Sequence, residues 1–262
     1  WPPADGTDAD RSVRASHVVI VSLLALLAGL VVFRPWPLDE PTIYRADVFQ
    51  HLALTQASNS IGAPSVSPGL GAPGTVDWTA FPTGAERLQV AMLHLFDAVS
   101  GNVVVAMNLY LLVGLVLSAA VTYAVLRWLR LAPVIAGGAA LVIAMGPAWS
   151  EAVFAGHLFL FSMWPVSLGL YLVFWALDRT GRRPWPSPGS TAIAACAAVA
   201  VALSSAYYAV FTVILIVGTA VLAALRRRDV RRLIAPAVVV GLIVVVAGAS
   251  LAPQLLSRRG AP

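Results

Sequence analysis

The hydrophobic positions of the chain come in long runs, and short polar segments that contain arginine separate them. A helix needs about 20 apolar residues to cross the roughly 30 Å hydrocarbon core of a bilayer. The pattern therefore predicts an all-α integral membrane protein with about seven transmembrane helices, built as a single polytopic domain over residues 1–262. The predicted spans are 17–33, 103–126, 132–149, 159–177, 190–205, 207–225 and 233–251.

The apolar run from 190 to 225 is the hardest to divide. Arginines at 182–183 precede it and arginines at 226–228 follow it. If both clusters lie on the cytoplasmic side, the run must cross the membrane twice. We therefore predict two short spans that meet near Ser205, with the neighbouring tyrosines at the outer interface, where such rings prefer to lie.

The distribution of arginine predicts the orientation. Alternating spans place twelve of the seventeen arginines on the side of the N-terminus and five on the other side. Cytoplasmic loops carry an excess of basic residues. We therefore expect a cytoplasmic N-terminus and a long extracytoplasmic loop over residues 34–102.

That loop contains two amphipathic segments, 47–58 and 84–99, on either side of a glycine- and proline-rich stretch at 62–74. Both segments predict helices lying in the membrane interface, with the polar face toward water or substrate, or else plain surface helices with solvated faces. The polar faces comprise Asp47, His51, Thr55 and Ser58 in the first segment and Glu86, Arg87, His94 and Asp97 in the second. The apolar face of the second segment comprises Leu88, Met92, Leu95, Phe96 and Val99.

Composition agrees with this interpretation and excludes several classes of protein. Apolar residues make up 59% of the chain and charged residues 11%, which excludes an ordinary soluble enzyme, a disordered tail and a disulfide-stapled module. The net charge is +5, but no basic stripe with interleaved aromatics is present, so we expect no nucleic-acid partner.

Cys196 is the single cysteine of the sequence, so no intramolecular disulfide can form. Because the chain begins at Trp1 and ends at Pro262, we expect an N-terminal fragment of a longer protein.

Ionisable residues are missing from the predicted spans beyond residue 103, which argues against an ion-coupled transporter. The acidic residues and histidines gather on the predicted outer side, so any site should lie at that face of the membrane. A carboxylate there can act as a general base toward an acceptor hydroxyl, and arginine suits a phosphate leaving group. Asp47, His51 and Arg45 are candidates for this chemistry. The other ionisable residues on the outer side include Asp39, Glu40, Asp77, Glu86, Asp97, Glu151, His94 and His157.

A family resemblance appears at these residues. The stretch RADVFQHLAL at 45–54 resembles the start of the first outer loop in a group of bacterial polytopic proteins, as does GAPGTVDWTAFP at 71–82. The pieces GHLFL at 156–160 and SAYYAVF at 205–211 fit the same group. The chain is thus similar to the YfhO-type and related proteins of the GT-C glycosyltransferase superfamily, over residues 18–228.

The resemblance implies a multi-pass protein of the bacterial cytoplasmic membrane that transfers a sugar from a polyprenyl-phosphate donor to a cell-envelope acceptor. An acidic residue early in the first outer loop would act as the base or orient the acceptor. This role maps to Asp47, with the pair Asp39 and Glu40 as the alternative. Some members bind a divalent cation such as Mg or Mn, and the sequence shows no clear ligand set for one.

The remaining candidates each have a second interpretation. Asp77 and Trp78 could contact a sugar ring or pin the loop to the membrane. His157 could contact phosphate or end a helix, and Tyr207 and Tyr208 could line the site or anchor the interface. Two rival functions stay open, namely a transporter or flippase of lipid-linked sugars and a non-catalytic scaffold. The mid-span polar residues Asn108, Ser118, Thr122, Ser162 and Ser167 suffice for helix packing alone.

Overall fold

The computed structural model describes residues 8–40, 52–53, 55, 66–67, 76–77, 86–146, 159, 161–178 and 188–259. The described part is helical apart from one short antiparallel strand pair, β1 (Val66–Ser67) and β2 (Val76–Asp77). The helices are α1 (Asp8–Phe33), α3 (Arg87–Ser100), α4 (Val103–Trp128), α5 (Pro133–Ala144), α7 (Trp164–Asp178), α8 (Pro188–Ser204), α9 (Ala206–Arg227), the 3-10 turn η3 (Val230–Leu233) and α10 (Ile234–Arg259).

Local sequence signals set several of the helix boundaries. Asn102 caps α4, because its side-chain oxygen accepts hydrogen bonds from the backbone N–H groups of Val104 and Val105. Ser205 caps α9 in the same way through the N–H of Tyr207. Gly101 ends α3 with a φ of 66°, a left-handed conformation that glycine adopts without steric cost. The predicted division of the 190–225 run at Ser205 into two helices is therefore confirmed.

Within the described ranges, α1, α4, α9 and α10 each contain a segment long and apolar enough to cross a membrane. The other predicted spans coincide with shorter apolar helices, α5, α7 and α8. At a rise of about 1.5 Å per residue, a 12-residue helix such as α5 extends only ~18 Å. The helix in the predicted span 159–177 begins at Trp164, where Pro165 at the second position is tolerated because that N–H has no helical partner.

The outer surfaces of the long helices are apolar. Side chains such as Leu27 and Val31 of α1 and Val245 of α10 are 57–71% exposed. On α9, the exposed apolar residues include Phe211, Ile214, Leu215, Val217, Leu222 and Leu225. Continuous apolar surface of this extent is rare on soluble monomers. The fold is therefore that of a membrane-embedded helical protein.

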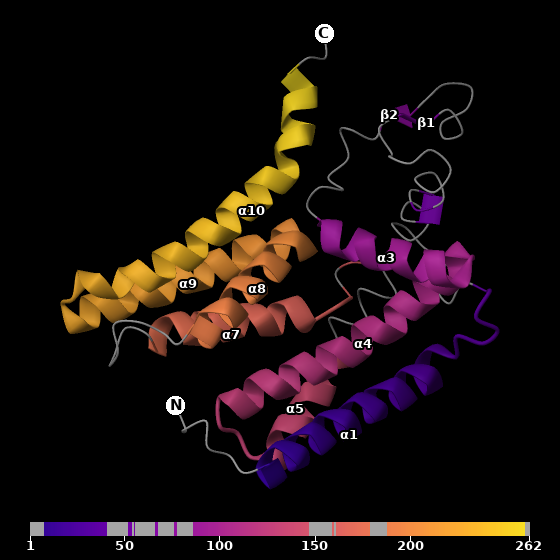
Figure 1. Cartoon of the computed structure of the whole chain (residues 1–262), viewed down its shortest axis with the longest axis horizontal. Helices are drawn as coiled ribbons and strands as arrows, with labels where there is room; N and C mark the ends of the chain where they lie inside the picture. Colours follow the sequence, from indigo (N-terminus) through magenta and orange to yellow (C-terminus); the bar gives the residue numbers. More distant parts are fainter. Residues whose placement is uncertain are drawn as a thin grey trace.

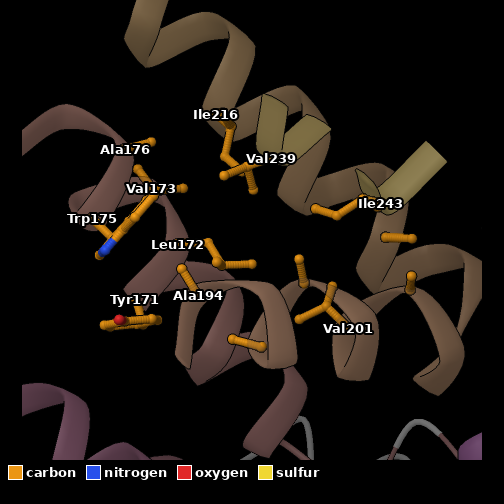
Figure 2. Close-up of a cluster of buried hydrophobic side chains, with 14 of the residues drawn as sticks. Tyr171, Leu172, Val173, Trp175, Ala176, Ala194, Val201, Ile216, Val239 and Ile243 are labelled. Carbon is orange, nitrogen blue, oxygen red and sulfur yellow. The ribbon is translucent and has the colours of Figure 1, made fainter. Parts of the chain in front are cut away.

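The helices form two packed groups, which Figure 1 shows side by side. In the first group, α1, α4 and α5 pack around Ala25, Met107, Leu111 and Leu115, and α3 adds Leu93. In the second group, α7 to α10 pack around Leu172, Val201, Ile216, Val239 and Ile243, and Figure 2 shows these side chains pointing into the space between the helices. Helix α4 joins the groups because it contacts α7 along its length.

Contacts along the helices show the relative directions of several of them. Tyr110 lies beside Ser162 and Thr122 beside Ser167, so α4 and α7 run in the same direction. Phe33 at the end of α1 packs against Phe161 just before α7, so α1 runs in the opposite direction. The indole of Trp175 near the end of α7 donates to Ser190 at the start of α8. Helix α1 is thus antiparallel to α4 and α7, and the end of α7 lies beside the start of α8.

Two glycines allow close helix approach. A Cβ on Gly114 of α4 would lie 2.6 Å from Ser162 Oγ, and one on Gly169 of α7 would lie 2.5 Å from Thr212 Oγ1. Small residues at such contacts are characteristic of helix packing in membranes, where backbones must approach closely. These positions tie α4 to α7 and α7 to α9.

Candidate functional site at the α3 end of the bundle

Helix α3 lies across one end of the bundle and bridges the two helix groups. Its last turn leads into the start of α4, while its first turn lies near the ends of α8 and α10 (Figure 1). We call this end the α3 end. It also carries the end of α1 and the starts of α7 and α9, as the contacts of Phe33, Tyr110 and Ser250 show.

The predicted helix at 84–99 is confirmed as α3, and the stripe that is most deeply buried lies at the edge of its apolar face. Leu95 and Val99 are 60% and 78% exposed, whereas Gln89 and Leu93 are buried. Because neighbouring residues lie about 100° apart on a helix, the buried stripe is turned by roughly a quarter turn from the apolar face. Met92 and Phe96 of the apolar face pack against the core of the first helix group, while Leu95 and Val99 stay exposed on the side expected to face the membrane.

The first turn of α3 is attached to α10. The guanidinium of Arg87 donates from Nε to Ser250 Oγ at 3.0 Å and from Nη2 to Ser250 O at 3.1 Å. Proline at 253 lacks an N–H, so the carbonyl of Ala249 loses its helical donor. Arg87 thus bonds to α10 at the residue that follows this missing helical hydrogen bond.

Glu86 precedes α3 on the same side of the helix as Gln89 and Leu93. Its carboxylate interacts electrostatically with the phenols of both Tyr110 and Tyr208. Tyr110 is fully buried and accepts a 3.4 Å hydrogen bond from Ser162 Oγ, and Tyr208 is 8% exposed. Glu86 therefore links the start of α3 electrostatically to tyrosines of α4 and α9.

The amide of Gln89 is the least satisfied group at the α3 end. The side chain is fully buried, and neither Oε1 nor Nε2 has a hydrogen-bond partner among the described residues. The indole nitrogen of Trp164, at the start of α7, is also buried without a partner in the described part of the chain. A buried polar group left without a partner costs about 1–3 kcal/mol. Such groups call for an explanation, and a role in binding or catalysis is a common one.

We define the polar junction as Glu86, which precedes α3, with Arg87 and Gln89 of α3 and with Tyr110, Tyr208 and Ser250. It holds one carboxylate, one guanidinium, an amide and hydroxyl groups. This set can bind a ligand that carries hydroxyl and phosphate groups, because each group donates or accepts hydrogen bonds and arginine pairs well with phosphate.

The predicted site residues fall into three groups according to where they lie in the structure. The structure places Glu86 and Arg87 at the start of α3, where Glu86 interacts with Tyr208 and Arg87 bonds to Ser250 of α10. It separates Tyr207 from Tyr208, because Tyr207 is 62% exposed on the outer surface of α9. The remaining predicted residues, Arg45, Asp47, His51, Trp78 and His157, lie outside the described residues.

The acidic alternative at the end of α1 is exposed. Asp39 and Glu40 both have exposed side chains, and the backbone around them is held by Asn108, whose Nδ2 donates to Leu38 O and Glu40 O at 2.8 Å. Asp77 lies in β2, where it pairs with Val66. Among the described residues, no cluster of three or more histidine, cysteine or acidic side chains could hold a metal ion, and the divalent cation stays a prediction.

Sequence reasoning missed Gln89, Tyr110, Trp164 and Ser250 as parts of this region. Their common signal is a polar atom within or beside an apolar helix, but that signal also marks ordinary packing groups. Only the packing of α3 distinguishes them. Comparison with known proteins adds no assignment, because no family model, curated protein or solved structure matches the chain.

Proposed function

We propose that the chain is a membrane glycosyltransferase of GT-C type, which moves a sugar from a polyprenyl-phosphate donor to a cell-envelope acceptor. The observation that carries this proposal is the polar junction at one end of an apolar bundle. There the start of α3 holds the carboxylate of Glu86, the guanidinium of Arg87 and the buried amide of Gln89, which has no partner among the described residues. A donor with a long hydrocarbon tail would reach this end from the bilayer. The resemblance of 45–54 and 71–82 to GT-C outer loops supports the same conclusion.

The proposal includes seven crossings of the bacterial cytoplasmic membrane with the N-terminus in the cytoplasm. The seven apolar helices, and the antiparallel packing of α1 on α4 and α7, support seven crossings. The short helices α5, α7 and α8 are compatible with this because irregular backbone is tolerated at membrane depth where protein surrounds it. The α3 end is then extracytoplasmic, since the arginine-rich segments lie at the opposite end.

In this proposal Asp47 is the base or orients the acceptor, and Asp39 with Glu40 is the alternative acidic pair. Arg45, His51 and Arg87 contact the donor phosphate. Arg87 would do so by exchanging one of its bonds to Ser250 for a phosphate oxygen, which offers the same acceptor chemistry with a full charge. Gln89 and Tyr208 would bind sugar hydroxyls.

The test uses membranes containing the full chain and a panel of labelled polyprenyl-phosphate hexoses and pentoses. Asp47→Asn should reduce sugar transfer at least about 100-fold, because general-base catalysis contributes roughly 10²–10⁴ to the rate. The matched control is Asp229→Asn, which changes an acid at the opposite end and should leave transfer unchanged. Full activity of Asp47→Asn together with loss in an Asp39→Asn, Glu40→Gln variant would move the role to that pair.

Topology is tested separately by labelling. In a Cys196→Ser background, the single substitutions Ser58→Cys and Asp229→Cys report the two sides of the membrane. We expect an impermeant maleimide added to whole cells to label the Ser58→Cys variant and not the Asp229→Cys variant. The reverse pattern would place the 34–102 loop in the cytoplasm and exclude the proposal. Energy-independent movement of labelled lipid-linked sugar across vesicles, without transfer, would instead favour the flippase.

A further inference from the structure

The turn between α9 and α10 is rich in arginine. We call residues 225–234 the arginine turn. Arg226 and Arg227 form the last turn of α9, and Arg228 caps it with a φ of 52°. Two more arginines follow in η3. The turn lies at the far end of α9 and α10 from the polar junction, as Figure 1 shows at its left.

Backbone hydrogen bonds close the end of α9 in this turn, whereas three of its guanidinium groups are exposed. The N–H groups of Arg228 and Asp229 donate to Leu225 O at 3.3 Å and Ala224 O at 3.2 Å, which closes the helix end. The side chains of Arg226, Arg227 and Arg228 are exposed, and within the described residues none of them makes a hydrogen bond or ion pair. The turn thus presents three exposed guanidinium groups on a backbone that is held by hydrogen bonds.

Large apolar side chains border these arginines. Leu225 is 69% exposed, Val230 75% and Ile234 64%. Cationic heads beside exposed apolar side chains are the arrangement that lies at a lipid interface, with the apolar groups among acyl chains and the charges at headgroup level. A protein or nucleic-acid partner is less well matched, since it would leave the apolar border facing water.

Other arginines reach the same end of the bundle. Helix α9 ends in the arginine turn, and Figure 1 shows α4 ending toward the same side of the bundle. Arg130, which follows α4, is exposed and has a φ of 69°. The positive charge of the arginine turn is therefore extended along the rim of the bundle rather than confined to one loop.

We infer that the arginine turn is a binding site for anionic phospholipid headgroups of the adjacent leaflet. The planar guanidinium matches a phosphate with two parallel hydrogen bonds, and basic residues near an anionic membrane surface are attracted to it strongly. Phosphatidylglycerol and cardiolipin have the required chemistry. This site is separate from the polar junction and does not depend on the proposed glycosyl transfer.

The experiment measures lipid selectivity of the full chain reconstituted in phosphatidylcholine vesicles with trace spin-labelled lipids. We expect spin-labelled phosphatidylglycerol to associate with the protein more strongly than spin-labelled phosphatidylcholine. Replacing Arg226, Arg227 and Arg228 with Gln should lower that preference about fivefold or more, and raising salt to about 1 M should lower it in the wild type as well, since salt screens exposed charges.

The matched control removes the same number of charges from the other end, as R34Q/R258Q/R259Q, and should keep the preference. Circular dichroism of each variant verifies that the helices are retained. An unchanged preference in the arginine-turn variant overturns the inference, as does an equal loss in the control. Competition by inorganic phosphate at about 10 mM would also overturn it, because that result indicates a site for free phosphate and not for a lipid surface.

Discussion

The seam between α4 and α7 and the polar junction both place polar groups inside an apolar bundle, but they treat them differently. In the seam, Ser118 Oγ donates to Gly114 O and accepts from Met163 N–H, and Thr122 bonds to Ser167 at 2.6 Å. At the polar junction, both amide atoms of the buried Gln89 lack a partner among the described residues.

Whether a buried polar group has a hydrogen-bond partner distinguishes a group that supports packing from one that is available to a ligand. A hydroxyl that finds a helix carbonyl or a facing hydroxyl costs little to bury and can fix how two helices pack. An amide buried without partners lowers stability and gives nothing to packing. A chain retains such a group most readily where something else bonds to it, which favours the polar junction as the site and the seam as scaffold.

The largest effect we expect is at the closest approach within the seam. Gly114→Leu would drive a side chain into Ser162 and Phe161, where even a Cβ lies 2.6 Å and 3.1 Å from their atoms. Overpacking of this kind typically lowers the free energy of unfolding by about 1–3 kcal/mol, and we expect the upper part of that range. Unfolding in mixed micelles with increasing dodecyl sulfate measures it.

The control is Gly218→Leu on α9, where a Cβ would meet nothing within 4 Å. This variant should unfold like the wild type. If both substitutions lowered stability equally, the loss would reflect any bulky replacement of glycine and not the packing of α4 on α7.

Much of this scaffold was predictable from sequence, because hydrocarbon imposes a pattern that few other environments produce. Each predicted span contains a helix, and the assignment of Ser118, Thr122 and Ser167 to helix packing is confirmed by their hydrogen bonds. The boundaries of α5 and α7 were less predictable. Apolar residues continue past both helix ends, so hydropathy alone could not locate them.

The candidate site was predictable only in part. Glu86 and Arg87 were recognisable as charges on an amphipathic segment. Which face of α3 is buried, however, depends on its contacts with α4 and α8, and hydrophobic periodicity does not predict those contacts. Gln89 was missed because a glutamine between leucine and valine looks like a solvated surface residue. Its burial became visible only when the helix was packed.

A smaller effect is expected from the hydroxyl pair of the seam. Thr122→Val removes one partner of a buried hydrogen bond and leaves Ser167 Oγ without it. Coupling energies of such pairs in membranes average about 0.6 kcal/mol and reach about 1.7. We expect a double-mutant cycle with Ser167→Ala to give a coupling in this range, measured from unfolding free energies. A coupling of zero would mean that the two hydroxyls are independent.

Substitution of Gln89 should raise the free energy of unfolding, whereas the substitutions in the seam lower it. Gln89→Leu replaces an amide that has no partner among the described residues by an apolar group of similar size, so we expect the unfolding free energy to rise by about 1 kcal/mol. Sugar transfer should fall in the same variant, because a group that bonds the substrate has been removed. A higher unfolding free energy together with full sugar transfer would show that Gln89 is a buried polar residue without a role in the site.

The smallest stability change, and the finest distinction, concerns Arg87. Arg87→Gln and Ser250→Ala both break the contact between α3 and α10, and because Arg87 is exposed, each should lower the unfolding free energy by only about 0.5–1 kcal/mol. The two variants differ in transfer. If Arg87 contacts the donor phosphate, Arg87→Gln abolishes transfer while Ser250→Ala largely retains it, since the guanidinium is still present. If Arg87 only holds α3 in place, both variants lose activity to the same extent, and an elevated KM for donor in Arg87→Gln alone would settle the role in favour of binding.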